Sequence, residues 1–256
     1  ADSVARHGGF CGLFGNDVVA PAILYAADLT VGGKAVVRVI NMSFLGTQSL
    51  VVGEALAYAR SRDIVLVAAA GNFGDSSLGF PASDDGVISV GGVSSTTKSG
   101  LIVNEHNSFS QYGFSLDAVA PGASTTTTEQ EGYNGGCPDN VRLAGPSGTS
   151  YASPLVAGVA ALVRSAHPAW TEAQVREHLM GTSVSVNALQ PSRGDDNDAF
   201  IGLLGHGKID AQRAVTLGYQ EIPKFIFDKY RLDDSAAGNG NGVAEPGEIV
   251  DVYVTL

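Results

Sequence analysis

Between residues 148 and 163 the sequence reads Gly148-Thr149-Ser150-Tyr151-Ala152-Ser153-Pro154 and continues as an unbroken run of apolar and small residues. Such residues on every side predict a helix that is buried all round, with Ser150 at its beginning. The free N–H groups of a first helical turn, and the positive end of the helix dipole, favour negative charge near that hydroxyl. Taken alone, Ser150 is most simply a helix cap. Its other interpretation, as a nucleophile, depends on the rest of the chain.

The composition is that of a globular protein with a sizeable hydrophobic core. The 256 residues are 44% hydrophobic and include 33 glycines, which suits one large α/β domain or a catalytic domain with a small appendage. The 15 basic and 26 acidic residues give a net charge of −11. We therefore expect neither nucleic-acid nor membrane partners. Cys11 and Cys137 are too few for a disulfide framework, and their pairing is left open.

Alternating strand and helix signals predict an α/β fold with a parallel sheet. Short β-branched or continuous apolar runs predict strands at 22–29, 36–40, 64–70, 87–92 and 116–120. A Gly-rich apolar segment, helical spacing and capping signals predict helices at 7–15, 50–62, 168–180 and 211–217. In parallel sheets covered on both faces, active sites gather beyond the carboxyl ends of the strands. Asn41 to Gly46 and Gly71-Asn72 fall at that edge.

The character of the sequence changes from Tyr219. Two runs typical of strands, 224–227 and 249–254, flank a polar, glycine-rich stretch. We therefore expect one domain over 1–218 and, over 219–256, the beginning of an accessory module that resembles a β-sandwich. Within the first domain, the polar stretch at 125–142 predicts an exposed loop or a small hairpin.

Three motifs together resemble those of the subtilisin-like serine peptidases, the subtilase family. Gly148 to Pro154 is similar to the nucleophile motif, Ala69-Ala70-Gly71-Asn72 to the oxyanion strand, and His7-Gly8 to the start of the histidine motif. Supporting matches lie at 20–25, 39–43, 119–122 and 205–210, so the resemblance covers roughly residues 5 to 217. It implies a three-layer α/β domain with a mainly parallel sheet. It also implies a secreted, monomeric endopeptidase that cleaves proteins or peptides.

The resemblance assigns a role to each motif. Ser150 would attack the peptide carbonyl, His7 would accept its proton, and Asn72 would donate its amide to the oxyanion. This chemistry requires no cofactor. The substrate pocket would be lined by residues that follow two neighbouring strands, namely Ser43, Phe44, Leu45, Gly46, Ala69, Ala70, Gly71 and Gly79. Leu45 stands where the family has a glycine, which would narrow the pocket.

The sequence departs from the family most clearly at the triad aspartate. The family order is Asp, His, Ser, with the aspartate some tens of residues before the histidine, but only six residues precede His7. Asp2 lies too close and has no apolar strand before it. Two interpretations stay open: a piece of a longer subtilase, which we favour, or a diverged domain that serves in binding or assembly. An α/β-hydrolase esterase is disfavoured, because Gly145-Pro146-Ser147-Gly148 is not a Gly-x-Ser-x-Gly turn.

Two acidic stretches offer oxygen ligands of the kind that calcium prefers. One comprises Asp195, Asp196 and Asp198, and the other comprises Asp233, Asp234, Asn239, Asn241, Glu245 and Glu248. The second spacing does not match an EF-hand, and the loop after Gly15 lacks the residues of the family's common calcium site. Solvated turns are the simpler interpretation of both stretches. A structural calcium ion stays an open alternative.

Overall fold

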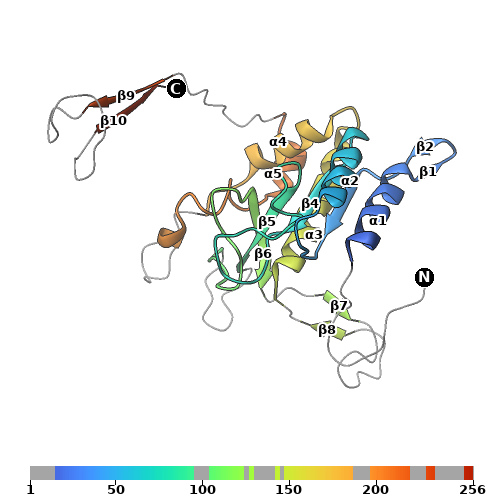
Figure 1. Cartoon of the computed structure of the whole chain (residues 1–256), viewed down its shortest axis with the longest axis horizontal. Helices are drawn as coiled ribbons and strands as arrows, with labels where there is room; N and C mark the ends of the chain where they lie inside the picture. The colour runs from blue at the N-terminus through green and yellow to red at the C-terminus, as the bar shows by residue number, and fades with distance from the viewer. Residues whose placement is uncertain are drawn as a thin grey trace. The chain divides into compact units, whose positions relative to one another are not determined.

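The computed structural model describes residues 15–94, 104–123, 127–129, 142–144, 147–186, 197–219, 229–233 and 251–255 (Figure 1). By its internal contacts the chain divides into two compact units, Ala1–Glu221 and Ile222–Leu256. The second unit contains one antiparallel strand pair, β9 (Lys229–Asp233) with β10 (Asp251–Thr255). Its assignment to an accessory module stays a prediction. Most of the helix predicted at 7–15 lies outside the described residues, as do both cysteines.

A four-stranded parallel sheet forms the centre of the first unit, as the sequence predicts. Its strands are β3 (Val39–Met42), β4 (Val65–Ala69), β5 (Ile88–Ser94) and β6 (Ala118–Ala123), hydrogen-bonded to one another in that order. Every residue of β4 is buried. This is the pattern expected of a central parallel strand that helices cover on both faces.

One face of the sheet packs against α1 (Asn16–Asp28) and α2 (Leu50–Ser61) (Figure 1). The structure confirms the helix that the spacing predicts at 50–62. The prediction of a strand at 22–29 is wrong, because nearly all of this segment lies in α1. Apolar residues recur there at helical spacing and are buried in one core with α2 and β4: Val19, Ala20, Ile23 and Ala27.

The opposite face packs against α3 (Thr149–Ala166), which contacts all four strands of the sheet. α4 (Glu172–Thr182) and α5 (Ala211–Thr216) pack against α3 and complete the third layer. The predicted cap of α4 is confirmed, since Thr171 and Gln174 form a reciprocal capping box. The prediction that α3 is buried all round is wrong. Leu155 is 46% exposed and Leu162 is 54% exposed, because the sheet covers only one side of the helix.

Two short hairpins complete the described part of the first unit. β1 (Thr30–Val31) and β2 (Lys34–Ala35) pair across a turn at Gly32-Gly33. Both glycines have positive φ, the conformation that glycine adopts without strain. β7 (Thr127–Glu129) pairs with β8 (Arg142–Ala144). The sequence predicts either an exposed loop or a small hairpin at 125–142, and this pair confirms the hairpin. A 3₁₀ turn lies at Asn197–Phe200.

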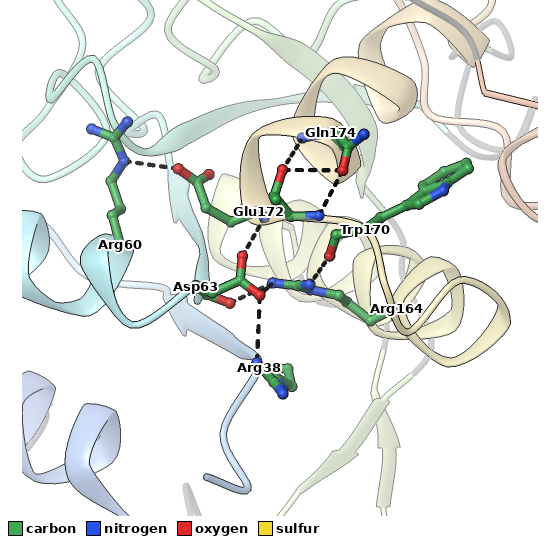
Figure 2. Close-up of polar contacts among 8 residues, drawn as sticks. Arg38, Arg60, Asp63, Arg164, Trp170, Glu172 and Gln174 are labelled. Atoms are coloured by element: carbon green, nitrogen blue, oxygen red, sulfur yellow. Dashed lines mark hydrogen bonds and ion pairs between the residues drawn. The ribbon is translucent and has the colours of Figure 1, made fainter.

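A polar network joins the end of α3 to the starts of β4 and α4 (Figure 2). Arg164 is only 6% exposed and contacts the Asp63 carboxylate at 2.9 Å. It also donates to the backbone oxygens of Asp63 and Trp170. The second carboxylate oxygen of Asp63 accepts the Glu172 N–H at 2.6 Å. A nearly buried guanidinium is therefore compensated by one carboxylate and two carbonyl groups.

Candidate active site

The order of the sheet brings the predicted site residues to one edge. β3 and β4 are parallel neighbours, so the segments that follow them, 43–46 and 70–72, leave the sheet side by side. α3 begins beside them, and the Gly71 N–H donates to Thr149 Oγ1 at 3.2 Å. The structure thus gathers the predicted pocket segments, Asn72 and Ser150 at the carboxyl edge of the strands. His7 lies outside the described residues.

Thr149 fixes the orientation of the Asn72 amide. It donates two hydrogen bonds to Asn72 Oδ1, one from its N–H at 2.8 Å and one from Oγ1 at 2.9 Å. A side-chain amide whose oxygen is held in this way turns its NH₂ group, a donor of two hydrogen bonds, in the other direction. The Asn72 side chain is exposed, and no acceptor for its Nδ2 lies within the described part of the chain. The amide is therefore free to donate to a ligand.

Ser150 lies in the first turn of α3, where the sequence predicts it. The residue before the helix is Gly148, whose φ of 154° is rarely adopted by other residues. Its N–H donates to Gly122 O at 2.7 Å, which anchors the helix start against β6. In this turn the Thr149 N–H donates to Asn72 Oδ1 and the Tyr151 N–H to Gly148 O, whereas the Ser150 N–H has no acceptor in the described part of the chain. Ser150 Oγ donates to Ser43 O at 3.3 Å.

Ser43 fastens the segment after β3 to the first turn of α3. Its hydroxyl donates to Ser150 O at 3.0 Å and accepts from Asn41 Nδ2 at 2.8 Å. Ser153 Oγ lies 3.0 Å away and completes the set. One donated and two accepted bonds use the full capacity of a hydroxyl group. The position of the predicted pocket wall relative to Ser150 is therefore determined by side-chain hydrogen bonds.

Most of the predicted pocket residues lie in two segments, 43–46 and 69–71, and residues 79–80 hydrogen-bond to both. Gly79 N–H donates to Ala70 O at 2.9 Å, and Gly46 N–H donates to Phe80 O at 2.8 Å. A Cβ atom built on Gly79 would lie 2.3 Å from Leu45 Cδ2. The Leu45 side chain thus lies directly against Gly79.

Gln111 is a site residue that the sequence analysis misses. It is 2% exposed, and its Oε1 accepts the Phe73 N–H at 3.2 Å while its Nε2 donates to Ser77 O at 3.0 Å. Its own N–H donates to Gly71 O at 3.2 Å. Gln111 therefore holds the turn that carries Asn72 from the side opposite Thr149. No local pattern indicates this role, because the partners are 34 to 40 residues away. Thr149 was missed as well, although it lies within the Gly-Thr-Ser motif.

Two other histidines, His106 and His178, are buried and contact backbone carbonyl groups. His106 Nε2 lies 3.1 Å from Ser110 O and its ring packs against Tyr112. His178 Nε2 lies 2.8 Å from Ala214 O. Burial disfavours the charged imidazolium, so the pKa of each histidine is lowered from 6.5.

Neither a cluster of metal ligands nor a membrane-spanning helix occurs among the described residues. No group of three or more His, Cys, Asp or Glu side chains there is arranged to hold a metal ion. Most of the two acidic stretches lies outside those residues, so a structural calcium ion stays an open prediction. None of the described helices is long and apolar enough to cross a bilayer.

Comparisons with known proteins agree with this geometry. The sequence pattern of the subtilase family, peptidase family S8, matches residues 12–207. Subtilisin BL of Lederbergia lenta is 36% identical over 191 residues, which cover 74% of this chain and 60% of the relative. Subtilisin E of Bacillus subtilis is 42% identical over 150 residues, or 57% of this chain and 35% of the relative. The chain thus spans about 60% of the Lederbergia relative and less of the other.

Solved structures give the same result. A protease of Pseudoalteromonas arctica PAMC 21717 superposes with a TM-score of 0.61 at 31% identity, covering 77% of this chain and 57% of that one. The structure of sphericase superposes with a TM-score of 0.55 at 28% identity, covering 66% and 56%. The three-layer arrangement and the family pattern over most of the chain lead to one conclusion: the protein belongs to the subtilase family.

Proposed function

We propose that this protein is a serine endopeptidase in which Ser150 is the nucleophile and Asn72 the oxyanion donor. One observation carries the proposal. The Asn72 oxygen is engaged twice by Thr149, so its NH₂ group is free beside the first turn that contains Ser150. A fixed amide donor next to a helix N-terminus is suited to the negative charge of a tetrahedral intermediate. A helix cap alone would have no use for such an arrangement.

The proposed reaction proceeds in two halves. His7 accepts the Ser150 hydroxyl proton while Oγ bonds to the peptide carbonyl carbon, and the carbonyl oxygen becomes an oxyanion bound by Asn72 Nδ2 and the Ser150 N–H. The C–N bond then breaks, and the leaving amine takes the proton from His7. Water repeats the sequence on the acyl-enzyme and releases the acid. Ser150 Oγ must first turn away from Ser43 O, to which it now donates.

The backbone near Ser150 supports an extended substrate. We expect the backbone of the segments that follow β3 and β4, residues 43–46 and 70–72, to pair with an extended substrate as an added strand. Protein or peptide substrates, secretion and action as a monomer are part of this proposal. The chemistry uses side-chain and backbone groups only, and calcium would have a structural role.

A catalytically inactive binding domain is the second candidate, and one observation favours it. The Ser150 hydroxyl donates its proton to Ser43 O at 3.3 Å, so in this arrangement the proton is held by a backbone carbonyl.

Covalent labelling with a small fluorophosphonate tests the proposal. After a long incubation at pH 8, mass spectrometry should find the phosphonyl group on Ser150. Ser150→Ala and His7→Ala should abolish or strongly slow labelling, whereas Ser165→Ala, an exposed serine near the end of the same helix, should label like the wild type. A folded protein with no label on Ser150 would refute the peptidase proposal and leave the binding domain.

A further inference from the structure

We infer that Leu45 restricts the residue before the cleaved bond to small side chains: glycine, alanine or serine. The inference rests on the proposed function and adds a substrate class to it. It depends on the position of one side chain between the segments that follow β3 and β4. None of its steps requires His7.

The space for this substrate side chain is bounded on three sides. Residues 43–46 form one wall and residues 70–72 the other, since they follow parallel neighbouring strands. The far end is closed by Gly79 and Phe80, which hydrogen-bond to both walls at 2.9 and 2.8 Å. A peptide whose carbonyl lies between Ser150 Oγ and Asn72 Nδ2 directs its preceding side chain into this slot.

Leu45 occupies the closed end of the slot. Carbon atoms of neighbouring groups approach to about 3.5–4.0 Å, yet a Cβ on Gly79 would be 2.3 Å from Leu45 Cδ2. Leu45 would have to move for Gly79 to carry even one methyl group. The Leu45 side chain therefore occupies the space beside Gly79 that the ring of an aromatic substrate side chain would need.

The backbone on both sides of Leu45 is held in place. Phe44 packs against the hydrophobic core that contains α1 and α2. Gly46 N–H is bonded to Phe80 O. Turning Leu45 outward would expose apolar surface that is now covered, since the residue is 38% exposed. A large substrate side chain must offset that cost, whereas a small one need not.

Labelling rates of the full chain test this inference. The probes are two peptidyl phosphonates, with alanine or phenylalanine before the phosphorus, and the small fluorophosphonate, which has no such side chain. Wild-type Ser150 should react at least about tenfold faster with the alanine probe, the scale on which pocket size discriminates. Leu45→Gly should bring the ratio of the alanine-probe rate to the phenylalanine-probe rate to about one or below, and Leu45→Ala should give an intermediate ratio. The rate of each protein with a peptidyl probe is divided by its rate with the small probe, so that a general change in Ser150 reactivity cancels.

A matched control separates pocket size from general destabilisation. Leu217 is 39% exposed and follows α5, so Leu217→Gly removes a similar side chain elsewhere and should keep the wild-type ratio. Equal rates for the two peptidyl probes in the wild type, or an unchanged ratio in both Leu45 variants, would overturn the inference and leave the proposed function intact. Failure of the small probe to label wild-type Ser150 would overturn both.

Discussion

Replacement of Thr149 by valine tests how Asn72, the proposed oxyanion donor, is oriented. Valine has nearly the shape of threonine but lacks Oγ1, which donates to Asn72 Oδ1 at 2.9 Å and accepts the Gly71 N–H at 3.2 Å. The lost bond to Asn72 Oδ1 costs about 1 kcal/mol, and leaving the buried Gly71 N–H without an acceptor costs about 1–3 kcal/mol. We expect the free energy of unfolding to fall by about 3 kcal/mol.

The same substitution should slow labelling without removing the donor. Asn72 Oδ1 keeps its bond from the Thr149 N–H at 2.8 Å and loses the other. If the productive orientation of the Asn72 amide loses about 1.4 kcal/mol of stabilisation, the labelling rate falls about tenfold. Asn72→Ala, which removes the amide, should cost about 10²–10³, a figure measured on a subtilisin. Thr149→Ser keeps both bonds and should label at nearly the wild-type rate.

The assay combines urea denaturation with fluorophosphonate labelling followed by mass spectrometry. If Thr149 acts through Asn72, the effects of Thr149→Val and Asn72→Ala on the labelling rate should not multiply in the double variant. Two outcomes would refute the reasoning. One is a folded Thr149→Val protein that labels at the wild-type rate, and the other is a double variant in which the two factors multiply.

Three further predictions concern other parts of the structure. Gly148→Ala should lower the labelling rate and the unfolding free energy, because φ is 154° and the new Cβ would lie 3.4 Å from Asn72 Nδ2; unchanged kinetics would contradict this. Asp63→Ala should cost about 3 kcal/mol in urea denaturation, because Arg164 loses its carboxylate; Asp63→Asn, which keeps an acceptor for the α4 N–H, should cost less. The pKa of His178 is lowered from 6.5, so protons bind more tightly to the unfolded chain. Its stabilising contribution is complete above pH 6.5 and declines as the pH falls through that value. His178→Gln should flatten this part of the stability profile measured by urea titrations from pH 7.5 to 5.5, and an equally steep profile would contradict the assignment.

Elements with a strong local pattern could be predicted from the sequence. β4 is a continuous apolar run, α2 keeps helical spacing, and α4 begins with its own capping residues. Residues 22–29 of α1 were predicted as a strand because so short an apolar run fits the period of a strand as well as that of a helix. The exposure of α3 could not be predicted, because it depends on which elements cover the helix rather than on its own residues.

The candidate site was predictable as a set of motifs but not as a geometry. Ser150 and Asn72 stand in recognisable motifs, so their meeting at one edge follows once the strands are known to be parallel. The bonds that orient Asn72 join residues 77 positions apart. Gln111 lies in a loop without a motif. Such contacts arise from the tertiary fold, and no local signal encodes them.

The contacts at the two ends of α3 have a mechanical consequence. α3 and β4 run in opposite directions: Thr149 meets Asn72 at one end of the pair, and Arg164 meets Asp63 at the other. The two junctions are about 22 Å apart along the helix. A lengthwise slide of α3 by a single residue, about 1.5 Å, would have to break both junctions together. The distance between the start of α3 and Asn72 is therefore set by contacts at both ends of the helix.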